Sequence, residues 1–246
     1  MVTGTFLEAT MHGSNLHGGE FIRSDFGGAR LTKANISAAN LQGANVANAR
    51  LDGSNLRGSI LAGVDLTQAD LRDAIVSRGT ATLPLDLQIV LRDHALWIDS
   101  NGKEGHRAVL KDIEPGDADL ANIYLSGADL RECHWPGAKL AGGLFVLADF
   151  RGADMHEADF GRAKLSGADL GKANLSGARF HRANLAPLKL VHKDGSESST
   201  FRAVNLRGAD LRNASFNGAI LTDATTDDTL TEGIELTGAN IKGTSL

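Results

Sequence analysis

The chain has 246 residues, 42% of them hydrophobic and 5% aromatic, and its 30 acidic and 25 basic side chains give a net charge of −5. This mild acidity argues against direct binding to nucleic acid. A single cysteine excludes a fold held by internal disulfides. There is no apolar run of membrane-spanning length and no N-terminal signal, so we expect a cytoplasmic protein without a membrane partner.

Residues 1–77 repeat with a period of five. A large apolar residue stands at every fifth position from Phe6 to Val76, and two residues earlier there is usually a small one, such as Ala29 or Ser54. In an α-helix this period would spread the apolar residues around the axis, and in a flat strand it would place them on alternate faces. It therefore predicts a backbone that turns within each pentad and stacks coil on coil, which is a β-solenoid.

Residues 78–109 interrupt this period and are predicted to be an insertion that contains an α-helix over about residues 84–100. Pro84 suits a first helical turn with Asp86 beside it, and Asn101-Gly102 suits the end. One face of this helix is apolar apart from a histidine, and it consists of Leu87, Val90, Leu91, His94 and Ile98.

The period resumes over residues 110–190, which form the second predicted solenoid segment, with Leu190 as its last inward residue. Residues 191–198 (VHKDGSES) are polar and contain Asp194-Gly195, so they are predicted to form a short projecting loop. Residues 199–246 are predicted to be C-terminal coils that begin with Phe201 at an inward position.

Four stretches carry the sequence of a known repeat: Ala128-Asp129-Leu130-Arg131, Ala168-Asp169-Leu170-Gly171, Ala173-Asn174-Leu175-Ser176 and Ala209-Asp210-Leu211-Arg212. They resemble the A(D/N)LXX units of the pentapeptide-repeat family. The resemblance implies an all-β fold, a right-handed quadrilateral parallel β-helix in which four pentads make one coil. A coil of that size would stack Asp129, Asp149 and Asp169 in one column.

The sequence holds no nucleotide-binding loop, paired cysteine motif, nucleophile elbow or zinc-binding His-Glu-x-x-His motif. The histidines are scattered, so no metal, cofactor or catalytic residue is predicted. Cys133 stands at a small inward position, where its expected role is packing.

The column of Asp129, Asp149 and Asp169 is the first candidate interaction surface. Stacked carboxylates could imitate a phosphate backbone, and the resemblance implies an alternative function, because fluoroquinolone-resistance members of the family mimic DNA and bind gyrase. Two residues further on, however, Arg131 and Arg151 make this face self-neutralising.

A second candidate surface consists of apolar residues at outward positions, namely Tyr124, Leu144, Val146 and Leu147. Either the inserted helix folds back and covers them, or they form a dimer or partner interface. The projecting loop adds candidate contacts at His192, Lys193, Asp194 and Glu197.

These observations predict a non-enzymatic scaffold that displays charged and polar ladders to a protein partner. A DNA mimic that binds gyrase or topoisomerase is the alternative, and an enzyme with a site near the helical insertion is a second one. Open coil ends also favour a homodimer, formed end to end or side to side.

Overall fold

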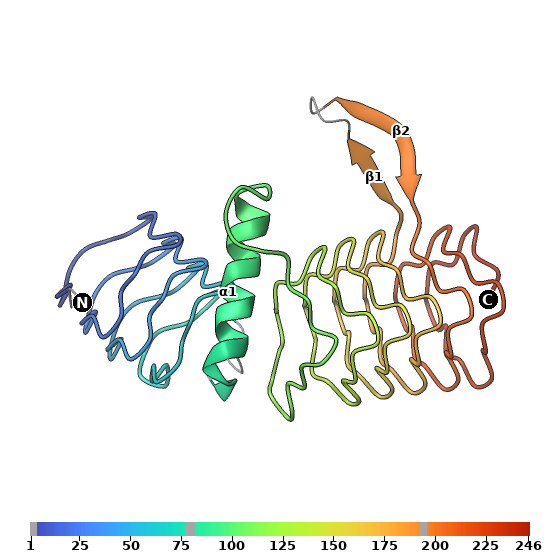
Figure 1. Ribbon diagram of the computed structural model, residues 1–246, viewed down its shortest axis with the longest axis horizontal. Coiled ribbons are helices and arrows are strands. Elements are labelled where there is room, and N and C mark those ends of the chain that lie inside the picture. Colours follow the sequence, from blue (N-terminus) through green and yellow to red (C-terminus); the bar gives the residue numbers. More distant parts are fainter. Residues whose placement is uncertain (1–3, 77–81, 192–195) are drawn as a thin grey trace. The chain divides into compact units, whose positions relative to one another are not determined.

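The computed structural model describes residues 4–76, 82–191 and 196–246 (Figure 1). The chain divides into two compact units, of which the first is Met1–Ala108 with Asn122–Tyr124 and the second is Val109–Ala121 with Leu125–Leu246. The named elements are helix α1 (Leu85–Asp99) and strands β1 (Leu188–Val191) and β2 (Glu197–Arg202). Within the described ranges, no helix has the length and apolar character needed to cross a bilayer.

Outside these elements both units consist of stacked coils joined by single parallel bridges. Thr5 pairs with Asp25 and Asn15 with Asn35, so bridged residues are 20 positions apart. The Phe6 N–H donates to the Asp25 carbonyl at 2.6 Å, and the Asp25 N–H donates back to the Gly4 carbonyl at 2.9 Å. One coil therefore contains four pentads, and each bridge ties it to the next coil by hydrogen bonds.

A tight turn after each large apolar residue produces the period of five. In one such turn the Ala209 N–H donates to the Leu206 carbonyl at 2.9 Å, and the third residue, Gly208, has a φ of 65°. This is the pattern of a type II turn, which needs a positive φ at its third residue and favours glycine there.

The inward rows are those that the period predicts. Leu41 and Leu61 in the first unit are 3% and 1% exposed, and Leu130 and Leu170 in the second are fully buried. Burying one such side chain contributes about 1.5–3 kcal/mol to stability. The second unit also stacks the rings of Phe160, Phe180 and Phe216, with centroids 5.0 and 4.5 Å apart.

The second interruption is longer than the predicted loop 191–198, because β1 and β2 form an antiparallel hairpin that pairs Leu188 with Arg202. The hairpin stands out from the coils of the second unit (Figure 1). The inward positions predicted for Leu190 and Phe201 are therefore wrong: Leu190 lies in β1, and Phe201 lies in β2 with 60% of its surface exposed.

Helix α1 lies where the sequence predicts a helix and packs against coils of the first unit. The Gln88 Oε1 accepts a hydrogen bond from the Leu61 N–H at 2.9 Å, and the Arg92 Nε donates to the Ala38 carbonyl at 2.9 Å. The approach is closest at Gly58, where an added Cβ would lie 2.4 Å from the Ala95 Cβ. Small coil residues thus make room for the helix.

Candidate interaction surfaces

Where the residue before a large apolar residue is Asp or Asn, its side chain often stabilises the following turn. The Asp169 Oδ1 accepts from the Gly171 N–H at 3.1 Å, and the Asn174 Oδ1 accepts from the Ser176 N–H at 3.2 Å. Equivalent side chains of neighbouring coils also bond to one another, as where the Asn205 Nδ2 donates to the Asp169 Oδ1 at 2.7 Å. The polar column is therefore part of the folded framework.

Two arginines clamp the carboxylates of this column from outside. The Arg131 Nε and Nη2 donate to the Asp129 Oδ1 and Oδ2 at 2.8 and 2.6 Å, and Arg151 binds Asp149 in the same way at 2.9 and 2.7 Å. Each guanidinium also lies 3.8 Å from the carboxylate of the next coil. The structure thus confirms that Asp149 and Asp169 follow Asp129 in one column, as the bridges between them require.

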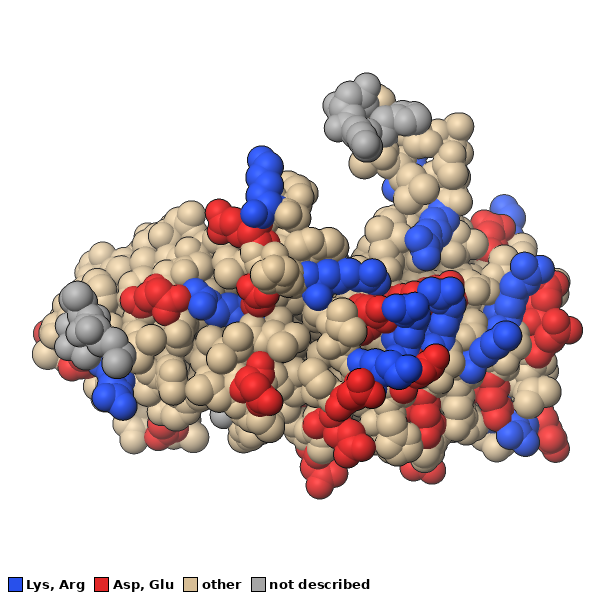
Figure 2. All heavy atoms as spheres, viewed as in Figure 1, with Lys and Arg blue, Asp and Glu red and all other residues tan. Residues whose placement is uncertain are grey.

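In each of these ion pairs the arginine lies outside and the aspartate lies beneath it. The Asp129 and Asp149 side chains are 9% and 17% exposed, whereas those of Arg131 and Arg151 are 52% and 54% exposed. On the visible face of the second unit, Lys and Arg side chains gather in front of acidic ones (Figure 2). The outermost groups are therefore guanidiniums, and a partner would meet them before it met a carboxylate.

The column of exposed arginines that contains Arg131 and Arg151 continues past the hairpin. Asp169 pairs with Asn205, 36 positions away, so the residue in line with Arg131 and Arg151 two coils later is Arg207. The Arg207 side chain is 64% exposed and donates from Nε to Asp227 at 2.6 Å. We call Arg131, Arg151 and Arg207 the arginine wall; in the coil between Arg151 and Arg207 the position in line is Gly171, followed by Lys172.

The pKa of the Asp149 carboxyl reflects this arrangement. Burial by itself raises the pKa, but the side-chain and backbone hydrogen bonds from Arg151 outweigh burial, so the pKa lies below its ordinary value. Hydrogen bonding to the carboxylate likewise raises the pKa of Arg151. Both partners therefore stay charged over the physiological pH range.

The same Asp-Xaa-Arg clamp occurs away from the arginine wall. Arg212 binds Asp210 at 2.9 and 2.6 Å in the second unit, on a column shared with Asn174. Arg72 binds Asp70 in the first unit, where its side-chain hydrogen bond lowers the pKa of Asp70 to about 2. The clamp is thus a local property of the repeat, and what distinguishes the wall is that two clamps, those of Arg131 and Arg151, lie in neighbouring coils of one column.

The residues of the predicted apolar surface are divided between the two compact units. Tyr124 groups with the first unit, whereas Leu144, Val146 and Leu147 are half-buried residues of the second. An added Cβ on Gly167 would lie 3.1 Å from the Leu147 Cδ2 and 3.2 Å from the Leu188 Cβ. Gly167 therefore lies close to both Leu147 and the base of the hairpin. Covering of these residues by the inserted helix, the alternative to a dimer or partner interface, stays a prediction.

The hairpin exposes apolar side chains of its own. Val191 and Phe201 are 66% and 60% exposed, and Phe201 borders a shallow hollow of about 470 Å³ together with Pro187, Ala203 and Asp223. Of the predicted loop contacts, His192, Lys193 and Asp194 lie outside the described residues, and Glu197 is the first residue of β2.

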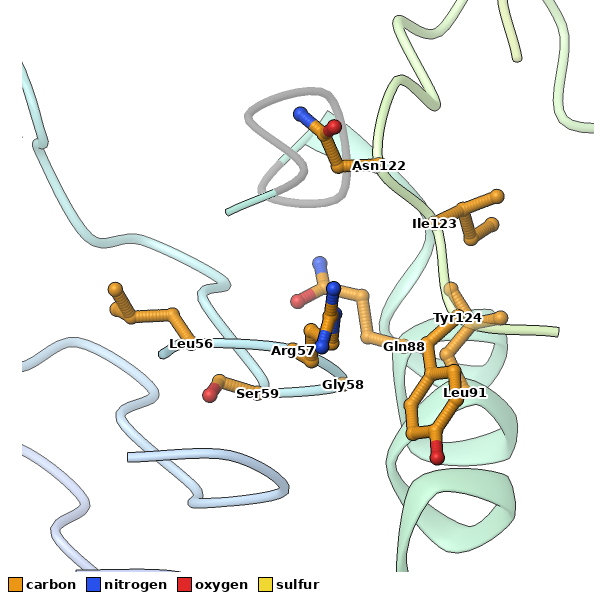
Figure 3. A pocket seen from close by; sticks show the side chains of 9 residues that line it. All are labelled: Leu56, Arg57, Gly58, Ser59, Gln88, Leu91, Asn122, Ile123 and Tyr124. Carbon is orange, nitrogen blue, oxygen red and sulfur yellow. The ribbon is translucent and has the colours of Figure 1, made fainter. Parts of the chain in front are cut away.

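Under helix α1 the first unit contains a small pocket between the coils and the helix (Figure 3). The Arg57 guanidinium lies over the Tyr124 ring, 5.7 Å from its centroid, and the Tyr124 hydroxyl donates to Asp99 at 3.4 Å. Burial, followed by the Asp99 charge, raises the pKa of Tyr124 to about 12. The enclosed space of about 20 Å³ is close to that of one water molecule, so the pocket serves the docking of α1.

One cluster near α1 bears on the enzyme alternative. The His17 Nδ1 lies 2.9 Å from the Ser37 Oγ and 3.6 Å from the Asp99 Oδ2. Serine and aspartate both approach the same ring nitrogen, whereas a catalytic triad needs one on each nitrogen. Among the described residues, no group of three or more His, Cys, Asp or Glu side chains could hold a metal ion.

Sequence reasoning missed Arg207, Val191 and the exposure of Phe201. Counting in steps of 20 beyond Arg151 leads to Gly171 and Val191, because the hairpin changes the step to 36. No local signal in the sequence reveals this shift, because Leu190 is five residues after Leu185 and Phe201 is five residues before Leu206.

The sequence model described as pentapeptide repeats matches the chain with eight copies, over residues 9–46, 39–78, 118–156, 136–167, 158–186 and 198–225. No curated protein gives a significant sequence match.

Several solved structures are similar to this chain. One is HetL from the cyanobacterium Nostoc sp. strain PCC 7120, involved in heterocyst differentiation regulation (25% identity, 93% of this chain, 87% of that chain, TM-score 0.28). Another is a pentapeptide repeat protein of the Arabidopsis thaliana thylakoid lumen (29% identity, 52% of this chain, 68% of that chain, TM-score 0.26). A third is QnrB1, a plasmid-mediated fluoroquinolone resistance protein (13% identity, 100% of this chain, 92% of that chain, TM-score 0.32).

Proposed function

Because this chain belongs to the pentapeptide-repeat family, we propose that it is a non-enzymatic scaffold that binds a protein partner through its second unit. The right-handed quadrilateral form of the coil is part of the proposal, and the four pentads in each coil support it. Neither a membrane nor a nucleic acid is among the proposed partners.

The observation that carries the proposal is the hairpin formed by β1 and β2. A two-stranded hairpin is marginally stable in water by itself, yet this one stands out from the coils and exposes Val191 and Phe201. Large exposed apolar side chains on a projecting element are typical of protein contact sites.

A site-specific cross-link tests this proposal. A photoreactive phenylalanine analogue at Phe201 should capture a defined protein from the native host, and the purified protein should then bind the unmodified chain. Binding should weaken about tenfold or more in the Val191→Ser, Phe201→Ser variant, because exposed apolar anchors dominate such contacts.

The control variant is Leu230→Ser. Leu230 is 52% exposed in a coil of the same unit, so its loss removes a similar apolar side chain without touching the hairpin. If the hairpin variant and this control bind the partner equally well, the hairpin is not the contact site and the proposal fails.

The gyrase alternative receives less support from this surface. DNA mimicry needs carboxylates on the outside, and here Asp129 and Asp149 lie under guanidiniums. A supercoiling assay with and without a fluoroquinolone tests the alternative directly, and inhibition or protection of gyrase by this chain would restore it.

Self-association is a second proposal about partners. The inward residues Leu236 and Ile241 of the C-terminal coil are half-buried, in contrast to the fully buried Leu211 and Phe216 of the preceding coils. A second copy stacked on this coil would bury them. Light scattering that shows only monomers at high concentration would reject this proposal.

A further inference from the structure

We infer that the arginine wall binds an acidic α-helix of the partner, with glutamate or aspartate side chains along one face of that helix. The inference rests on the proposed function and adds the chemistry of the partner.

The free donors of the clamped arginines carry the first step. A guanidinium has five N–H donors, and Arg151 uses its Nε and one donor of Nη2 on Asp149. The edge formed by Nη1 and the rest of Nη2 is left, and such an edge binds a second carboxylate by two parallel hydrogen bonds. Arg131 is held in the same way.

The clamp also prepares the arginines for binding. An exposed arginine ordinarily loses side-chain freedom when it pairs with a carboxylate. Here Asp129 and Asp149 already fix the two guanidiniums, and both arginines remain more than half exposed. A second carboxylate therefore meets donors that are in place.

Spacing selects a helix over a strand. Neighbouring coils are about 4.8 Å apart, so the three steps from Arg131 to Arg207 span about 14 Å. Three turns of a helix span about 16 Å, whereas three same-side intervals of an extended strand span about 20 Å. Long arginine side chains can absorb a mismatch of about 2 Å more readily than one of about 6 Å.

The ends of the wall limit the length of the contact. The next residue in line after Arg207 is Asp227, which pairs with Arg207 and is 61% exposed, so its carboxylate repels an acidic helix that continues in that direction. The residue in line before Arg131 is Lys111, whose ammonium already binds Glu132 beside Arg131. The wall therefore fits about three turns with acidic residues three or four positions apart.

Labelled peptides test the inference without an identified partner. The first is an alanine-based helix with glutamates three or four positions apart on one face, and the second has the same composition with the glutamates spread around the helix. The third places glutamates at alternating positions among threonines and valines, and the fourth probe is a single-stranded oligonucleotide. Fluorescence anisotropy at low and physiological salt gives the affinities.

We expect the one-face helix to bind at least about fivefold more tightly than the other three probes. The Arg131→Gln, Arg151→Gln variant should lose about tenfold of that affinity, because each exposed pair contributes up to about fivefold. The matched control is Arg72→Gln, Arg212→Gln, which removes the same two charges and the same clamps away from the wall. It should change the affinity less than about twofold.

If both double variants lost the same affinity for the one-face helix, the loss would come from the change in net charge alone, and the inference would be overturned. Tighter binding of the extended peptide or of the oligonucleotide would also overturn it. Such a result leaves the proposed function standing if the Phe201 cross-link still identifies a partner. Thermal melts of both variants confirm that each is folded.

Discussion

Arg151 covers Asp149. Its Nε and Nη2 donate to the two carboxylate oxygens at 2.9 and 2.7 Å, and the arginine side chain is 54% exposed while the carboxylate is 17% exposed. The charge that a passing molecule meets is therefore opposite to the charge that a column of aspartates suggests. Which member of an ion pair lies outside decides what kind of partner the surface can attract.

Substitutions in one coil should separate inward from outward positions. Leu170→Asp should cost several kcal/mol or prevent folding, because it buries an unpaired carboxylate, and Ala168→Leu should cost about 1–3 kcal/mol by overpacking. Both residues are at most 1% exposed. Asp169→Asn should cost less than about 1 kcal/mol, since an amide oxygen can still accept from Gly171. Thermal and urea unfolding measure the order, and the reverse ranking contradicts the inward assignment.

A pair of glycine substitutions should isolate the docking of α1. Gly58 and Gly13 both have a φ of +65°, but an added Cβ meets the Ala95 Cβ at 2.4 Å only at Gly58 and meets nothing within 4 Å at Gly13. Gly13→Ala should lower the free energy of unfolding by about 1–2 kcal/mol, because the backbone at this position has a positive φ. Gly58→Ala should cost about 1–3 kcal/mol more, by displacing the helix.

Hydrogen exchange supplies the second readout for this pair. Amides of α1 should exchange faster in Gly58→Ala than in Gly13→Ala, because only the alanine at position 58 pushes α1 away from the coils. Equal exchange in both variants contradicts the described packing of α1.

Cys133 should report on unfolding of the second unit. Burial raises the pKa of its thiol from 9.0 to about 12, and the side chain is fully buried. The thiolate is the reactive form, so a thiol reagent at pH 8 should react only as fast as the second unit unfolds. Because the folded pKa is the higher one, this group stabilises the fold fully below about pH 9 and less as the pH rises toward 12. Rapid labelling of the folded protein would contradict this prediction.

Asp70 should titrate unusually low. The hydrogen bonds from Arg72 lower its pKa from 3.8 to about 2, so its favourable contribution is complete above about pH 4 and disappears as the pH falls through about 2. In Arg72→Gln the pKa should return toward 3.8. Carboxyl chemical shifts followed by NMR measure both values, and an unchanged pKa in the variant would show that Arg72 is not the cause.

The repeat made the core predictable because each inward residue is determined by its own pentad. Leu130 and Leu170 needed only the period, and the helix needed only its local pattern between Pro84 and Gly102. Leu190 and Phe201 keep the same period by chance, so no local signal separates them from true inward residues. Their placement depends on the pairing of β1 with β2, which is a contact between distant positions.

The candidate site was predictable only as a set of charges. The alternation of Asp129, Arg131, Asp149 and Arg151 shows that the face is self-neutralising. Which partner of an ion pair is buried and which is exposed, however, depends on side-chain length and on the hydrogen bonds of the turn. Aspartate is short and bonds the backbone two residues on, while arginine reaches over it. Arg207 was out of reach because the hairpin shifts the column.

The hairpin leaves the coils at one corner and returns to them there, so that Asp169 bonds to Asn205 as it would to the next coil in an uninterrupted array. Stacking thus continues although the hairpin lengthens the step between paired residues from 20 to 36 positions. The hairpin can therefore change in sequence, and with it what the molecule recognises, while the coils on either side keep their contacts.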